Sequence, residues 1–230
     1  KLTFLFLLLS AIFLIAILVL KGLDSKRLTV LSEDRTAELG DLFDKVINLK
    51  GLGIKTLVSD YTFWDEMVSF IKTRDSQWAK QNIDICLTTY NVSAIWVYNA
   101  NSELVYSVNL LRPREHKALP FSGEFIGNAF LKERLRRFFI NTPDGLMEVW
   151  GATIHPTADP ERETLPQGYF FSGRLWDDAY IDEISKLLNF QITVTPFTSQ
   201  VATRRIQPAK GTIAFTKELY DWRDRVVALV

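Results

Sequence analysis

The residues with the clearest capacity for chemistry lie between Asp60 and Asp65, where two carboxylates flank three aromatic side chains. Tyr61 and Trp64 belong to the apolar face of a predicted helix, on which apolar residues recur every three or four positions. A carboxylate beside an aromatic ring can bind an ammonium group through ion pairing and cation–π attraction. These residue types favour a structural alternative, in which Trp64 anchors the helix on a sheet and Asp60 or Asp65 caps a loop or accepts from an indole N–H.

Other catalytic or metal chemistry finds little support in the sequence. His116 and His155 are the only histidines; both are expected at the surface of loops, without the spacing that gathers metal ligands. The chain has no G-x-S-x-G motif and no glycine-rich phosphate loop. The single cysteine, Cys86, has no flanking basic pair to activate it, and is expected to be a buried helix residue. We therefore expect a chain that is not an enzyme and holds neither a metal nor a cofactor.

Two groups of charged residues could bind a ligand, but an ordinary structural role is favoured for each. The basic run from Lys132 to Arg137 could contact lipid head groups or an anionic ligand, but a solvated helix face is favoured. Asp177, Asp178 and Asp182 could bind a cation. Capping of a helix N-terminus explains the first two more simply.

Composition limits the class of protein. The formal net charge is zero, which gives no long-range attraction to nucleic acid. Aromatic residues make up 13% of the chain, enough for a folded core, and one cysteine excludes an intrachain disulfide. We expect these 230 residues to be a piece of a longer protein.

The first 20 residues predict a membrane anchor. From Leu2 to Leu20 no residue is charged, and a span requires about 20 apolar residues. A cleaved signal peptide is the alternative, but its apolar core has about 7–15 residues and ends at a small-x-small site, which this run lacks. Residues 1–27 are therefore predicted to be a transmembrane anchor with its flank. Flanking charges do not settle the orientation.

A long helical stalk is predicted next, over residues 28–74, as one or two helices. The apolar stripe Leu57, Tyr61, Trp64, Val68 and Ile71 extends upstream through Leu39, Phe43 and Val46. Gly51 and Gly53 weaken the helix and indicate either a bend or close packing.

The remaining pattern predicts one α+β domain, residues 28–230, with an antiparallel sheet and flanking helices. A hairpin is expected at residues 94–98 and 104–108, where β-branched and aromatic runs enclose a turn. The other expected elements are a loop at 113–127, helices at 78–90, 129–140 and 177–188, and strands at 145–154, 168–175, 190–196, 212–216 and 225–230, the last two joined by a turn around residues 220–222.

The segment Leu57 to Ile71 resembles the D-Y-x-x-W-D signature of the CHASE4 domain, an extracytoplasmic sensor module of bacterial and archaeal signalling proteins. Downstream features follow in the family's order: Asn82, the 94–108 hairpin, and Gly173-Arg174-Leu175 before a helix. The resemblance covers roughly residues 28–230. It implies a fold similar to PAS-like Cache sensors, with a long N-terminal helix before a curved antiparallel sheet.

The resemblance also implies a topology and partners. Residues 28–230 would lie on the periplasmic side of the inner membrane, between two membrane helices, with a cytoplasmic histidine kinase, cyclic-di-GMP enzyme or chemoreceptor module in cis. The positions that match the family pattern are Asp60, Tyr61, Trp64, Asp65 and Arg174.

Two functional hypotheses follow. In the first, the domain is a sensor that binds a small ligand and shifts the N-terminal helix: Arg174 holds an acidic group, Asp60 or Asp65 a basic one, and the apolar walls are Trp64, Trp96, Tyr98 and Tyr106. In the second, the pocket is empty and the domain is a homodimerisation or protein-interaction module, with a helical seam along Leu39 to Ile71. An enzyme is the least favoured class, because no motif assembles a nucleophile, base and orienting group.

Overall fold

The computed structural model describes residues 2–111, 119, 126, 130, 133–198 and 213–230; along the first helix it describes side chains from Glu33 onward, together with Phe13, Leu14 and Lys21. The chain divides into two units, residues 1–44 with 206–216 and residues 45–205 with 217–230. The first helix, α1 (Leu2–Tyr61), contributes to both. In the first unit, the rings of Phe43 and Phe215 pack 5.7 Å apart.

The expected membrane anchor falls largely on side chains outside the described set. The backbone of Leu2–Leu20 is helical, as part of α1. Where side chains are described, no helix has enough consecutive apolar residues to cross a membrane. The anchor at residues 1–27 therefore stays a prediction.

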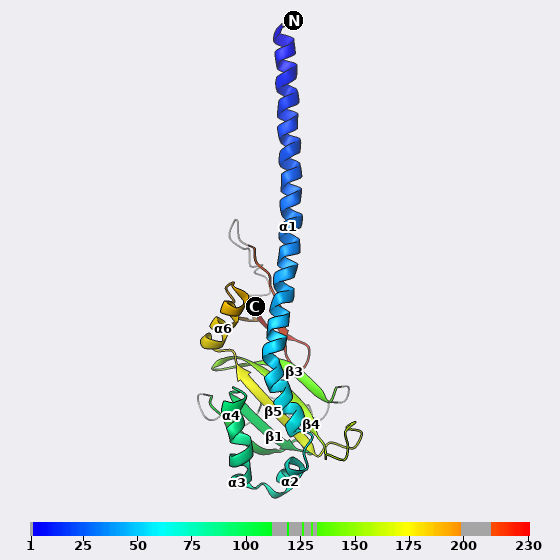
Figure 1. Ribbon diagram of the computed structural model, residues 1–230, viewed down its shortest axis with the longest axis vertical. Coiled ribbons are helices and arrows are strands. Elements are labelled where there is room, and N and C mark those ends of the chain that lie inside the picture. The colour runs from blue at the N-terminus through cyan, green and yellow to red at the C-terminus, as the bar shows by residue number, and fades with distance from the viewer. Residues whose placement is uncertain (1, 112–118, 120–125, 127–129, 131–132, 199–212) are drawn as a thin grey trace. The chain divides into compact units, whose positions relative to one another are not determined.

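A five-stranded antiparallel sheet forms the centre of the second unit (Figure 1). Its order is β2-β1-β5-β4-β3, so the hairpin β1–β2 pairs with β5 and not with the strand that follows it. The expected hairpin and the two expected central strands are confirmed. The bounds are β1 Ala94–Asn99, β2 Leu104–Asn109, β3 Leu135–Thr142, β4 Gly145–Ile154 and β5 Gly168–Leu175.

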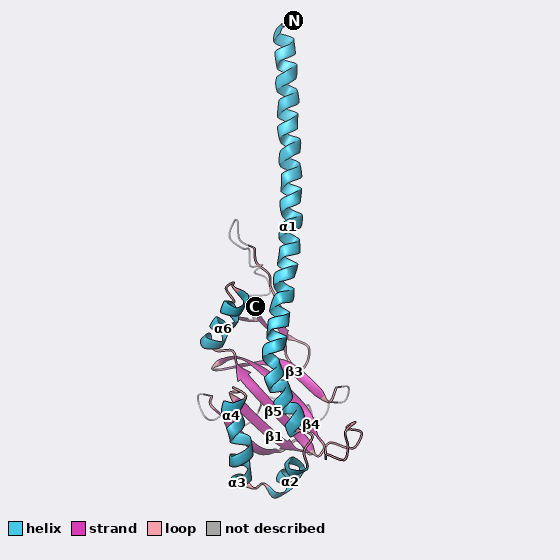
Figure 2. Cartoon of the chain, in the orientation of Figure 1, coloured by secondary structure: helices cyan, strands magenta, loops and turns pink. Residues whose placement is uncertain are grey.

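One face of this sheet, here called the first face, packs against the end of α1 and the helices that follow it (Figure 2). Alternate strand residues such as Ile95, Val97 and Phe170 meet Leu57 and Val58 of α1 there. The covering helices are α2 Asp65–Thr73, α3 Ser76–Ala79, the π-helical turn η1 Lys80–Asp84 and α4 Ile85–Thr89. The last three together confirm the helix expected at residues 78–90, and α1 with α2 shows that the helical segment expected over residues 28–74 is divided after Tyr61.

The opposite face, here called the second face, has its own apolar cluster. Trp96, Tyr98 and Phe171 alternate with the first-face residues, and Phe130 stacks on Tyr169 across it with ring centroids 5.8 Å apart. Gly173 leaves room for the Trp96 ring, since a Cβ there would lie 3.2 Å from Trp96 Cζ3. The loop expected at residues 113–127 lies outside the described residues, except for Leu119 and Ile126.

The C-terminal part of the chain adds helix α6 and a small sheet. α6 (Asp178–Leu188) begins after Asp177, whose carboxylate accepts the Tyr180 N–H over 2.8 Å, so the expected cap is confirmed. The small sheet has the order β6-β8-β7, and the expected turn before its last strand is held by Asp221, which accepts from the N–H groups of Arg223 and Arg225. Its strands are β6 Thr195–Pro196, β7 Glu218–Tyr220 and β8 Val226–Leu229.

Three of the secondary-structure elements expected after residue 128 differ in the structure. The helix expected at 129–140 is wrong, because the chain forms strand β3 from Leu135 onward. All eight β3 residues pair with β4, and the consecutive side chains of Phe138, Phe139 and Ile140 are all buried, as in a strand covered on both faces. The strand expected at 190–196 shortens to the two residues of β6. Residues 213–216 form no strand, and the pairing lies further along, in β7.

Close packing, and not a bend, accounts for Gly51. α1 is continuous through both glycines to Tyr61. A Cβ on Gly51 would lie 3.1 Å from Glu148 Oε1, whereas one on Gly53 would meet nothing within 4 Å. Gly51 thus lets α1 approach a buried carboxylate of β4.

Candidate functional site

Tyr61 and Trp64 join the end of α1 to the helices on the first face. The Tyr61 hydroxyl donates to the Asn82 carbonyl over 2.7 Å, at the π-helical turn η1 where the regular bonding pattern is interrupted. Burial raises the pKa of Tyr61 well above its ordinary value. The Trp64 ring lies 5.5 Å from Tyr61 and 5.3 Å from Trp78, centroid to centroid. Trp64 is thus a packing anchor, as the structural alternative expected.

The two carboxylates of the motif are both exposed. Asp65 Oδ1 accepts the Thr157 N–H over 2.9 Å, so it fastens a loop that follows β4. This is the loop-capping role that the structural alternative expected. Asp60 lies in the last turn of α1.

The structure does not bring the predicted ligand residues together. Tyr61, Trp64 and Tyr106 pack on the first face, where the Tyr106 hydroxyl donates to Asp84 Oδ1 over 2.6 Å. Trp96 and Tyr98 lie on the second face, across the sheet. Their ligand-binding roles stay predictions, but one ligand cannot touch all of them.

Arg174 joins three backbone segments on the first face. Its guanidinium donates to the carbonyls of Lys50, Tyr90 and Asn91 over 2.9, 3.1 and 3.0 Å. Tyr90 and Asn91 follow α4, so the cation lies at the negative end of that helix. The Tyr180 ring covers it at 5.3 Å. These contacts occupy Arg174 structurally, and its expected role as a receptor for an acidic group stays a prediction.

Beside Arg174 lies a buried acid that the sequence analysis missed. Glu148, in β4, is fully buried and pairs with Arg137 Nε at 2.8 Å. The same carboxylate accepts the indole N–H of Trp150 over 2.9 Å and that of Trp176 over 3.4 Å. The sequence signal for this site was Glu148 itself, the only charged residue in the predicted strand at 145–154. Arg137 had been expected on a solvated helix face, which is wrong because residues 135–137 belong to β3.

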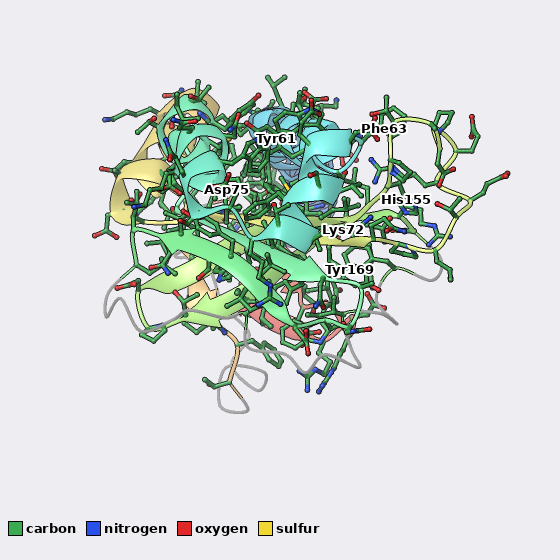
Figure 3. The ribbon with its side chains drawn as sticks, turned by 90° about the horizontal axis from the view of Figure 1, so that it is seen from below. Tyr61, Phe63, Lys72, Asp75, His155 and Tyr169 are labelled. Atoms are coloured by element: carbon green, nitrogen blue, oxygen red, sulfur yellow. The ribbon has the colours of Figure 1, made fainter. Side chains whose placement is uncertain are left out.

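A second polar cluster surrounds His155, which the sequence analysis placed at the surface. That expectation is wrong: His155 is fully buried. Its Nδ1 lies 3.0 Å from Asp159 Oδ2 and its Nε2 lies 3.0 Å from Thr153 Oγ1. Figure 3 places His155 beside Phe63, at the end of α1. His116 lies outside the described residues.

The Thr153–His155–Asp159 contacts have the order of a nucleophile, base and orienting acid. The Thr153 hydroxyl is buried and already bonded to the imidazole ring, and the Thr153 carbonyl accepts from Arg162 of the loop that follows β4. The arrangement is therefore suited to holding a loop in place. Across the described part of the chain, no three His, Cys, Asp or Glu residues gather as a metal site. Cys86 is buried and free, as expected.

Comparison with known families matches this fold to one of them. The model of the CHASE4 domain matches residues 46–195, more than half of the chain. A search of curated proteins gives no match. CHASE4 domains are extracytoplasmic sensory domains of signalling proteins. The matched range holds the end of α1, the D-Y-x-x-W-D motif and all five strands of the central sheet, and this chain belongs to the CHASE4 domain family.

Proposed function

We propose that this chain is the extracytoplasmic sensor of a membrane-bound signalling protein, that it binds a small molecule, and that α1 relays the bound state. The family supports the sensory role. The uncharged stretch Leu2–Leu20 supports insertion of the start of α1 into the inner membrane. On this proposal, residues 28–230 are periplasmic, and a cytoplasmic kinase or cyclic-di-GMP enzyme receives the signal in cis.

The observation that carries the ligand proposal is the unpaired indole N–H of Trp96. Trp96 is only 2% exposed, and among the described residues its Nε1 has no hydrogen-bond acceptor. A buried donor without a partner costs about 1–3 kcal/mol, which a ligand acceptor atom would recover. Tyr98 lies two residues away on the same face; its hydroxyl oxygen accepts the Leu119 N–H over 3.0 Å. A small, largely apolar molecule with a carbonyl or carboxylate oxygen fits this chemistry.

Binding on the second face can reach α1 through the sheet. Trp96 pairs in register with Phe171 of β5, and Arg174 on the same strand holds the α1 backbone at Lys50. A displacement of β5 therefore acts on the helix directly. The ligand shifts the equilibrium only by its differential affinity for the two positions of the strand.

The test follows the Trp96 indole resonance by ¹⁵N–¹H NMR while amino acids and small carboxylates are added to the 230-residue chain. We expect one chemical class to shift that resonance and to lose affinity in Trp96→Phe, which keeps a ring but removes the N–H. Trp78→Phe is the matched control, since Trp78 packs on the first face. Equal affinity in Trp96→Phe, or no shift from any member of the library, would contradict the proposed site.

A ligand-free homodimerisation module is the second candidate, favoured by exposed leucines on α1. Leu42, Leu49 and Leu52 are 43%, 67% and 50% exposed, and their spacings of seven and three suit a helical seam. Sedimentation of the chain and of Leu49→Glu would test it. A dimer that Leu49→Glu dissociates supports the seam, and a monomer at all concentrations argues against it.

A further inference from the structure

The loop after β4 is fastened to the joint between α1 and α2. This segment, residues 155–167, is here called the His155 loop. The His155 N–H donates to the Thr62 carbonyl over 2.9 Å, and the Thr157 N–H donates to Asp65 over 2.9 Å. Phe63 and His155 also form an isolated parallel bridge. The residues joined to the loop are those that end α1 and begin α2.

Arg162 strengthens this attachment from within the loop. Its Nη2 donates to Thr62 Oγ1 over 2.9 Å, and its Nη1 donates to the Thr153 carbonyl. Arg162 adopts a left-handed backbone with φ of 55°, which turns the chain so that the guanidinium points back toward α1. Thr62 is itself fully buried, so the contact lies in the interior.

His155, the first residue of the loop, has both ring nitrogens and its backbone N–H in hydrogen bonds. Asp159, which faces Nδ1, also accepts the N–H groups of Glu163 and Thr164 and the Thr164 hydroxyl. These bonds hold the pKa of Asp159 well below its ordinary value, so this carboxylate stays ionised. The Nδ1 of a neutral imidazole then donates to Asp159, and Nε2 accepts from Thr153.

We propose that protonation of His155 releases the His155 loop from the α1–α2 joint, which makes the domain responsive to extracytoplasmic acid independently of any ligand. Protonation turns Nε2 into a donor, so the Thr153 hydroxyl can no longer donate to the ring and must turn to accept from it. It also places a second buried cation near Arg162, whose guanidinium holds Thr62. The proton therefore acts on the contact that fixes the end of α1.

The charges around the ring set the direction of the response. Burial is the largest effect and lowers the pKa of His155; Arg162 and Arg134, which precedes β3, lower it too, while Asp159 raises it. In the released loop the pKa returns toward the ordinary value of about 6.5. The attached loop is therefore stable at pH 7.5 and loses stability as the pH falls below about 6.5.

Hydrogen exchange of the full 230-residue chain at pH 7.5 and pH 5.0 tests this, with protection factors corrected for the intrinsic rate at each pH. We expect protection of residues 59–65 and 155–164 to fall on the order of tenfold at pH 5.0, as linkage to one histidine allows. Protection of α6 is expected to stay constant. Unchanged protection at residues 59–65, while the His155 resonance titrates, would overturn the proposal.

Two variants separate the proton from general loss of structure. His155→Gln replaces the imidazole by an amide, which can still donate and accept hydrogen bonds but cannot titrate; it is expected to abolish the pH response, whereas His116→Gln retains it. If His155→Gln does not fold, Arg162→Gln serves instead: it should lower protection of residues 59–65 at pH 7.5 already. A full pH response in folded His155→Gln, or wild-type protection in Arg162→Gln, would contradict the proposal.

Discussion

Arg174 Nη1 donates to the Lys50 carbonyl over 2.9 Å, so a side chain of the central sheet holds the backbone of α1. The same guanidinium holds the turn between α4 and β1 through Tyr90 and Asn91. Any movement of β5 is thereby shared with α1 and with the end of α4. In a sensor whose output leaves through α1, this contact is a direct mechanical link between sheet and helix.

Replacing Arg174 by Met should destabilise the chain by about 3 kcal/mol, because three carbonyls lose a charged donor in a buried site. Arg174→Lys should recover only part of this stability. The planar guanidinium reaches three diverging carbonyls at once, whereas a single ammonium group cannot. Denaturant unfolding followed by circular dichroism measures both. Arg74→Met, at an exposed side chain, is the control and should change stability by less than about 0.5 kcal/mol.

Alanine at the two stalk glycines should have opposite effects. Gly53→Ala should stabilise the chain by up to about 1 kcal/mol, because the helix gains propensity and a Cβ meets nothing within 4 Å. Gly51→Ala should destabilise it by about 1–2 kcal/mol, because its Cβ presses on the Glu148 carboxylate that other bonds hold in place. Thermal unfolding of Gly51→Ala and Gly53→Ala measures both changes in stability. Stabilisation by both alanines would show that α1 is not pressed against β4.

Glu148→Gln should cost about 2–4 kcal/mol of unfolding free energy, because Arg137 then remains largely buried without its counter-charge. Glu38→Gln removes an equivalent charge from an exposed pair with Arg35 and should be almost neutral. Chemical denaturation of both variants provides the comparison. A neutral Glu148→Gln would mean that the two indole donors, and not the ion pair, satisfy this site.

Tyr61→Phe should destabilise the chain by about 1 kcal/mol, since the Asn82 carbonyl loses its phenolic donor while the ring packing stays. The loss should appear locally, as faster amide exchange in η1 and α4. Tyr220→Phe is the control, since the hydroxyl of Tyr220 bonds only at an exposed site. Equal exchange in the two variants would contradict a role for Tyr61 in holding the π-helical turn.

The elements predicted correctly from sequence are those with a strong local period. The hairpin around Trp96, the strands beginning at Gly145 and Gly168, and the capped helix after Asp177 all have it. β3 was mistaken for a helix because its arginines and phenylalanines satisfy both periods, and only pairing with β4 decides between them.

The site was predictable in type but not in arrangement. The D-Y-x-x-W-D residues were identified, and so was their structural alternative, which Trp64 and Asp65 follow. Alternation along β1 points Trp96 to the face opposite the one that Trp64 and its helices cover, and the spacing along the chain does not reveal which face those helices cover. The environments of Glu148 and His155 depend on segments distant in sequence, so the burial of these two residues could not be predicted from their neighbours along the chain.

The central claim is that the sheet domain faces the outside of the cell. Cys86 is the only cysteine and is buried, so a Cys86→Ser chain with one new cysteine at exposed Asp178 gives a clean probe. A membrane-impermeant maleimide should label Asp178→Cys in intact cells, whereas Lys1→Cys, on the predicted cytoplasmic side, should react only after lysis. Labelling of Asp178→Cys only after lysis would contradict the account.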